Sequence, residues 1–194
     1  LFEMKVGHIR TTETYEHVFL MDSVMDKLEE LPESEPRDVL INNLSYADYP
    51  HLIELSSYNK LLRLAGLPEL ALSEDEAAVY MDTEFVNKDR VNILNDILSE
   101  HPETQLDGNT LYLTAQVQSV SLVTDRSITL SFALIIPDEV FSYYTQNQHD
   151  IYINGILDKK TTSETSLMNV IYEINKKLDK TGQPDGCPLR QTQR

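Results

Sequence analysis

The chain has 194 residues, of which 41% are hydrophobic and 25% are charged, so it suits one large domain or two small ones. Its 32 acidic and 16 basic residues leave a net charge of −16. This balance argues against binding to nucleic acid or to an anionic membrane surface, because lysine and arginine mediate both. The single cysteine, Cys187, excludes an internal disulfide. An acidic surface keeps a protein soluble and favours cationic partners.

Neither a membrane span nor a signal peptide is visible in the sequence. The longest apolar run is "FALII", far below the ~20 residues that a helix needs to cross a bilayer. The start, "LFEMKVGHIR", lacks a long apolar segment and does not begin with methionine. We therefore expect a piece of a longer chain.

We predict a helix, a turn and two strands in the first quarter of the chain. Apolar residues recur at helical spacing over 11–31. The acidic "PESEP" at 32–36 predicts a turn. The segment 37–44, "RDVLINNL", is interpreted as a short strand, and a second strand is expected around 52–55.

The stretch "LSSYNKLLRLAGLPELALSEDEAAVY" (Leu55–Tyr80) has the features of a complete helix followed by a strand. Ser56 or Ser57 is the expected N-cap, Gly66 the expected left-handed stop, and Pro68 prevents the helix from resuming. The predicted buried stripe consists of Leu61, Leu62, Leu64 and Ala65. A turn at 73–76 then leads into an apolar strand at 77–81.

The second half alternates between helices and strands. The elements expected, in order, are a helix over 83–103, two or three antiparallel strands within 107–137 with turns at Asp107-Gly108 and 124–127, a short helix from Pro137, a strand from His149, and an amphipathic helix over 162–180. We predict a single compact α+β domain of mixed, mainly antiparallel strands with several short helices. It covers 1–180, and 181–194 form a loose tail.

Signatures of catalysis are absent from the sequence. It contains no G-x-S-x-G, no G-x-x-x-x-G-K and no G-x-G-x-x-G. His51 with Glu54, and His101 with Glu103, have spacings that metal ligands can adopt, but neither pair has further ligands nearby in sequence. We predict no catalytic residue, no cofactor and no metal. The chain is thus expected not to be an enzyme.

The clustered tyrosines have two interpretations. Tyr46, Tyr49 and Tyr58 lie close in sequence, as do Tyr143 and Tyr144. They could line a peptide-binding groove or simply be half-buried surface residues.

The 55–80 stretch resembles a recurrent segment of bacitracin-resistance-type ABC transporter permeases, which are FtsX-like permeases of Gram-positive bacteria. The similarity lies in a strand, a serine with "YNKL", a helix that ends in Gly66, and an acidic entry into the next strand. A second match is "ALIIPDEVFSYY", centred on Pro137 and Asp138, with "IYINGILDKK" after it. The order and spacing are similar to the large extracellular domain of such permeases over roughly 40–179.

The resemblance implies a fragment of a membrane protein that lies on the extracellular face of the cell membrane and would be flanked by membrane-spanning helices. In this family the ATP-binding subunit is a separate chain, and a sensor histidine kinase is a partner. The complex confers resistance to cell-wall-targeting antimicrobial peptides of the bacitracin or lantibiotic type. It recognises the cationic peptide or its complex with a lipid pyrophosphate.

Candidate peptide-binding residues follow from charge, since negative side chains attract cationic peptides. They are Glu74, Asp75, Glu76, Asp82 and Glu84. The adjacent carboxylates at 74–76 have a second interpretation as a solvated loop. Two other functions stay open: a mechanical lid or lever that binds nothing itself, and an unrelated acidic enzyme or adaptor domain.

Overall fold

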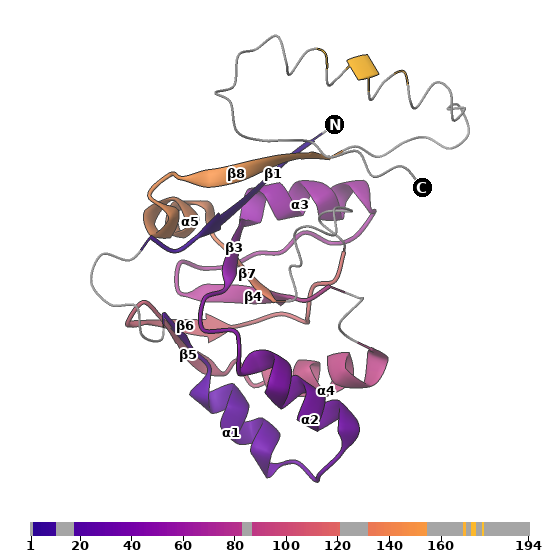
Figure 1. Cartoon of the computed structure of the whole chain (residues 1–194), viewed down its shortest axis with the longest axis vertical. Helices are drawn as coiled ribbons and strands as arrows, with labels where there is room; N and C mark the ends of the chain where they lie inside the picture. The colour runs from indigo at the N-terminus through magenta and orange to yellow at the C-terminus, as the bar shows by residue number, and fades with distance from the viewer. Residues whose placement is uncertain are drawn as a thin grey trace. The chain divides into compact units, whose positions relative to one another are not determined.

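The computed structural model describes residues 2–10, 18–82, 87–120 and 132–154, together with Asn169, Tyr172, Glu173 and Lys176. The segment that ends at Asn154 contains five described helices and eight described strands (Figure 1). In chain order they are β1 (Phe2–His8), β2 (Phe19–Leu20), α1 (Asp22–Glu30), α2 (Glu35–Leu44), β3 (His51–Glu54), α3 (Leu55–Leu64), β4 (Glu76–Tyr80), α4 (Lys88–Leu98), β5 (Glu103–Leu106), β6 (Asn109–Leu113), β7 (Ala133–Ile136), α5 (Asp138–Thr145) and β8 (His149–Asn154).

The described strands form one sheet in the order β2-β5-β6-β4-β7-β3-β1-β8. Five of the strand pairs are antiparallel, and the pairs β3–β7 and β4–β6 are parallel. The predicted class, a single compact α+β domain of mixed, mainly antiparallel strands with short helices, is confirmed.

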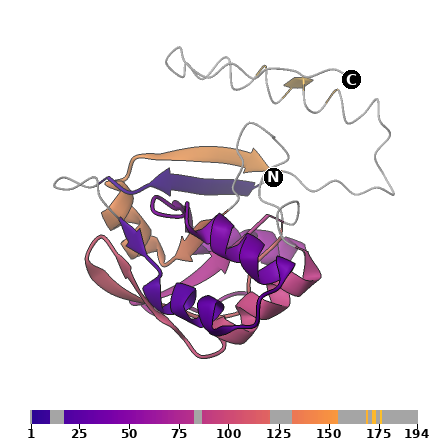
Figure 2. The ribbon, with the colours of Figure 1, turned by 60° about the horizontal axis from the view of Figure 1, so that its bottom comes forward.

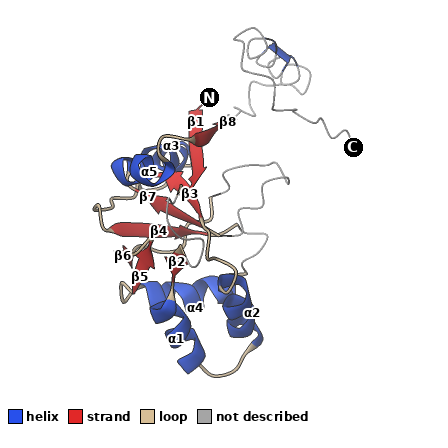
Figure 3. Cartoon of the chain, turned by 60° about the vertical axis from the view of Figure 1, so that its left-hand side comes forward, coloured by secondary structure: helices blue, strands red, loops and turns tan. Residues whose placement is uncertain are grey.

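Helices cover both faces of the sheet, and alternation along the strands supplies each face with apolar side chains. On β3, Ile53 faces the core beneath α3, whereas Leu52 faces the larger core shared by α1, α2, α4 and α5. Figure 3 shows α1, α2 and α4 gathered near β2, β5 and β6, with α3 and α5 near β1, β3 and β8. Both cores belong to the unit that Leu1–Gly155 form.

The predicted stop of the third helix is confirmed. Gly66 has φ +72°, its amide donates to the carbonyl of Arg63 at 3.1 Å, and the amide of Leu67 donates to that of Leu62 at 2.9 Å. These are the paired hydrogen bonds of a Schellman motif, which needs a left-handed residue after the helix.

Two details of the same helix were predicted wrongly. The helix begins at Leu55, so Glu54 rather than Ser56 or Ser57 is the N-cap residue. Leu64 is 52% exposed and Ala65 is also exposed, because the buried face instead runs through Ser57, Tyr58, Leu61 and Leu62. A strand leads directly into the helix, and this connection sets which helical face meets the sheet.

The first quarter requires larger corrections. The segment 37–44 is helical rather than extended and belongs to α2, whose Leu40 and Leu44 are buried one helical turn apart. Pro36 stands in the first turn of α2, where a proline is tolerated. The helix expected over 11–31 is α1, which begins only at Asp22 because Phe19 and Leu20 pair with β5.

Most later elements match their predictions. Strand β4, helices α4 and α5, and strand β8 lie where the sequence indicates, and Asp107-Gly108 forms the β5–β6 turn. Both turn residues have positive φ, which suits a tight hairpin. The turn expected at 124–127 lies outside the described residues. Strands β1, β2 and β5 were not predicted.

The segment Ile156–Arg194 forms a second unit. Its described residues are helical, as the helix predicted over 162–180 requires, and Lys176 lies 3.9 Å from Glu173. The boundary expected at 180 lies outside the described residues. Among the helices that the structure describes, none is long and apolar enough to cross a membrane.

Candidate functional site

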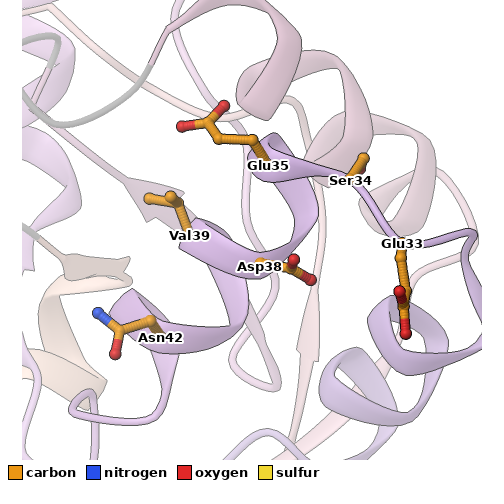
Figure 4. A pocket seen from close by; sticks show the side chains of 6 residues that line it. All are labelled: Glu33, Ser34, Glu35, Asp38, Val39 and Asn42. Atoms are coloured by element: carbon orange, nitrogen blue, oxygen red, sulfur yellow. The ribbon is translucent and has the colours of Figure 1, made fainter.

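A shallow, widely open acidic hollow of about 590 Å³ lies beside the start of α2. It is lined by Glu33, Ser34, Glu35, Asp38, Val39 and Asn42. Figure 4 shows these side chains along the first turns of the helix and the segment before it. Three of the six are carboxylates and none is basic, so the hollow offers acceptors to a cationic group.

The local sequence determines where these carboxylates lie on α2. Ser34 is the extended N-cap residue of α2, and Asp38 donates its amide to the Ser34 carbonyl at 3.0 Å. Glu35 and Asp38 fall in the first helical turn, where negative charge is favourable to the helix dipole. They therefore stabilise α2 whether or not they bind a ligand.

Two arginines already neutralise part of the hollow. Arg90 of α4 approaches Glu35 to 2.7 Å, and Arg37 approaches Asp38 to 3.2 Å. Arg37 also donates to the carbonyl of Leu28 at 2.9 Å, which ties α1 to α2. The Glu35 and Asp38 side chains remain 67% and 60% exposed, so both can still reach a ligand. Glu33 is exposed as well.

The residues predicted to bind peptide do not form one site. Glu74 and Asp75 are exposed in the turn before β4, and the Glu76 carboxylate accepts from the Ser73 amide at 2.7 Å. Asp82 follows the other end of β4, which places it ~20 Å from Glu76 at the usual rise of ~3.3 Å per residue. Glu84 lies outside the described residues. The hollow was not predicted, although Glu33, Ser34 and Glu35 belong to the acidic "PESEP" segment.

The two stretches that carry the family resemblance meet in the structure. Strands β3 and β7 pair in parallel, and the Ser56 amide donates to the Asp138 carboxylate at 2.9 Å. Next to this contact, the buried Glu54 carboxylate accepts from Lys5 at 2.6 Å and from Ser57 at 2.5 Å. Burial alone raises the pKa of Glu54, but these hydrogen bonds outweigh it and lower that pKa overall.

His51 and Glu54, which are close in sequence, do not converge as a metal site. His51 and Glu54 are three residues apart on β3, so their side chains leave opposite faces of the sheet. His51 instead contacts His8, with ring centroids 4.2 Å apart. Burial and the nearby His8 lower the pKa of His51 to about 4. The described residues contain no metal-compatible group of three or more histidine, cysteine or carboxylate side chains.

The tyrosines do not line one groove. Tyr58 is fully buried in the core beneath α3, whereas Tyr46 and Tyr49 are 81% and 53% exposed. Tyr143 is exposed and Tyr144 is buried, although their rings are in contact. The tyrosines close in sequence therefore divide between core and surface.

The chain was compared with protein families and with curated proteins. No family model matches the chain, and no curated protein sequence matches it.

Proposed function

We propose that this chain is the extracellular recognition domain of an ABC transporter permease that confers resistance to cell-wall-targeting antimicrobial peptides. It attracts a cationic peptide, or the peptide's complex with a lipid pyrophosphate, by negative potential and makes no covalent bond to it. The ATP-binding subunit and a sensor histidine kinase act with the permease.

The observation that carries this proposal is the acidic hollow on a chain of net charge −16. Exposed carboxylates in a concave surface raise the local concentration of cations and speed encounter. The two resemblance stretches contact each other at Ser56 and Asp138 and therefore belong to one paired unit.

The test compares two variants that remove the same charge from different places. Glu33→Gln with Asp38→Asn neutralises the hollow, and Glu74→Gln with Asp75→Asn neutralises the turn before β4. Calorimetric titration with bacitracin and with a cationic lantibiotic should show the hollow variant binding three- to tenfold more weakly, because exposed ion pairs contribute up to ~1 kcal/mol each.

The outcomes separate three accounts. Weaker peptide binding in the hollow variant alone supports the hollow as the binding site. Loss confined to the turn variant favours the residues predicted from the sequence. Equal small losses indicate attraction by the whole acidic surface, and no measurable binding by the unmodified chain contradicts the proposal.

A second candidate function is a lever that carries conformational change within the permease. Its support is the pairing of β1 with β8 at six positions, from Phe2 with Asn154 to Gly7 with His149 (Figure 2). The first and last described strands of this unit thus lie side by side. Deleting the domain from the full transporter tests this role. A lever predicts loss of peptide-stimulated ATPase activity even when the isolated domain binds no peptide.

A further inference from the structure

Two histidines from distant parts of the chain face each other at one end of the sheet. His8 is the last residue of β1, and His51 is the first residue of β3. They are direct partners in the antiparallel register, so both side chains leave the same face. Their ring centroids are 4.2 Å apart and their planes are inclined at 50°.

We propose that His8 and His51 together bind a divalent transition-metal ion such as Zn²⁺, with water completing its coordination. Imidazole nitrogens bind zinc at ~2.0–2.1 Å, so two nitrogens on one ion lie ~3 Å apart. The register and the ring contact place the two imidazoles so that rotation about their side-chain bonds can bring one nitrogen of each onto a shared ion. Imidazole ligands favour Zn²⁺, Cu²⁺ and Ni²⁺ over Mg²⁺ and Ca²⁺.

The surroundings of the pair favour a cation. Asp150 on β8 is the register partner of Val6, two residues from His8, and therefore lies on the same face of the sheet. Its negative charge acts on His51.

The pair is also accessible. The His8 side chain is exposed, whereas His51 is half-buried and held between β1 and β7. One ligand is thus fixed by the sheet, and the other borders the solvent from which the ion and its waters come. Because the described residues add no third ligand, the site differs from a closed structural zinc centre and leaves positions open for water or a bound molecule.

The experiment titrates the whole chain, stripped with a chelator, with ZnCl₂ and then NiCl₂ by calorimetry at pH 7.5. We expect one bound ion per chain, and a loss of affinity of at least tenfold in His8→Gln and in His51→Gln. Two control variants should bind as the unmodified chain does. They are His101→Asn, which keeps a residue that tolerates the positive φ of this position, and Cys187→Ser, which removes the lone thiol.

Melting temperatures measured with and without Zn²⁺ separate binding from folding. The unmodified chain should melt at a higher temperature when Zn²⁺ is present, and His8→Gln, which changes an exposed side chain, should fold but lose that increase. Unchanged zinc affinity in His8→Gln, loss of affinity only in Cys187→Ser, or no binding to the unmodified chain at 1 mM Zn²⁺ would each overturn the proposal.

Discussion

The carboxylate of Asp138, at the start of α5, accepts a hydrogen bond from the backbone amide of Ser56 in the first turn of α3. The two residues are 82 positions apart, yet the parallel pairing of β3 with β7 brings the starts of the two helices together. The N-cap residue of α3, Glu54, makes no side-chain capping bond. Asp138, from another element, therefore supplies the acceptor for a first-turn amide that an N-cap side chain usually provides.

Asp138→Ala should therefore destabilise the fold by ~1 kcal/mol, as loss of an N-terminal cap does. The measurement is urea denaturation followed by circular dichroism. Glu139→Ala, which removes a neighbouring exposed carboxylate, is the control and should stay within ~0.5 kcal/mol of the unmodified chain. Equal losses in both variants would show that helix-end charge, not the contact with Ser56, is responsible.

The part-buried Glu54–Lys5 pair predicts a specific dependence of stability on pH. The Glu54 pKa lies below its ordinary 4.5 in the folded chain, mainly because hydrogen bonds from Lys5 and Ser57 outweigh the opposing effect of burial. The carboxylate thus adds stability above pH 4.5, and this contribution disappears as the pH falls through the lowered pKa.

Glu54→Gln should lower the free energy of unfolding by ~1–3 kcal/mol at pH 7, because it leaves the partners of a buried charge poorly paired. The difference from the unmodified chain should shrink below pH 4. Glu3→Gln, at an exposed position on the same strand as Lys5, should show no such convergence. A difference that stays constant from pH 7 to pH 3 would rule out the ion pair as its cause.

Gly7 is required by close packing against α5. A methyl group built on it would lie 2.6 Å from Cγ2 of Thr145, a fully buried β-branched residue. Gly7→Ala should cost ~1–3 kcal/mol because the core must shift. Thr145→Ser removes Cγ2 and keeps the hydroxyl that donates to the Phe141 carbonyl at 2.7 Å, so the double variant should recover much of the loss. Additive losses in the double-variant cycle would contradict this account.

Gly66→Ala should destabilise the chain by ~1 kcal/mol, because its φ of +72° is unfavourable for a residue with a side chain. The added methyl group meets no atom within 4 Å, so the cost is conformational rather than steric. Gly66→Asn should cost less, since asparagine tolerates left-handed geometry. Denaturation of the two variants side by side checks the order, and an alanine variant as stable as glycine would refute it.

Local signals explain which parts of the fold could be predicted. The backbone preferences of a few residues mark such features: a helix end at Gly66, a helix start at Pro137 and a hairpin at Asp107-Gly108. The structure confirms all three. The prediction for 37–44 failed because its apolar residues suit either a strand or a short helix. The start of α2 at Glu35, with Pro36 in its first turn, distinguishes the two.

Long-range pairing explains what could not be predicted. Strand β1 has few strand-specific residues and exists through its partners β3 and β8. The same limit applies to the sites. Sequence proximity suggested His51 with Glu54, but β-sheet register brings His51 to His8. The predicted peptide-binding residues are likewise divided, with those at 74–76 before or at the start of β4 and Asp82 after its end.

The central claim, attraction of a cationic peptide by negative potential, is tested most directly by the salt dependence of binding. Exposed charges are screened over ~10 Å at 0.1 M salt and ~3 Å at 1 M. Calorimetric titration of the chain with a cationic lantibiotic should therefore give a dissociation constant that rises at least tenfold between 0.02 M and 0.5 M NaCl. A neutral peptide of similar length should give no heat at either salt concentration. Equal affinity for the lantibiotic at both salt concentrations, or no binding at either, would contradict the claim.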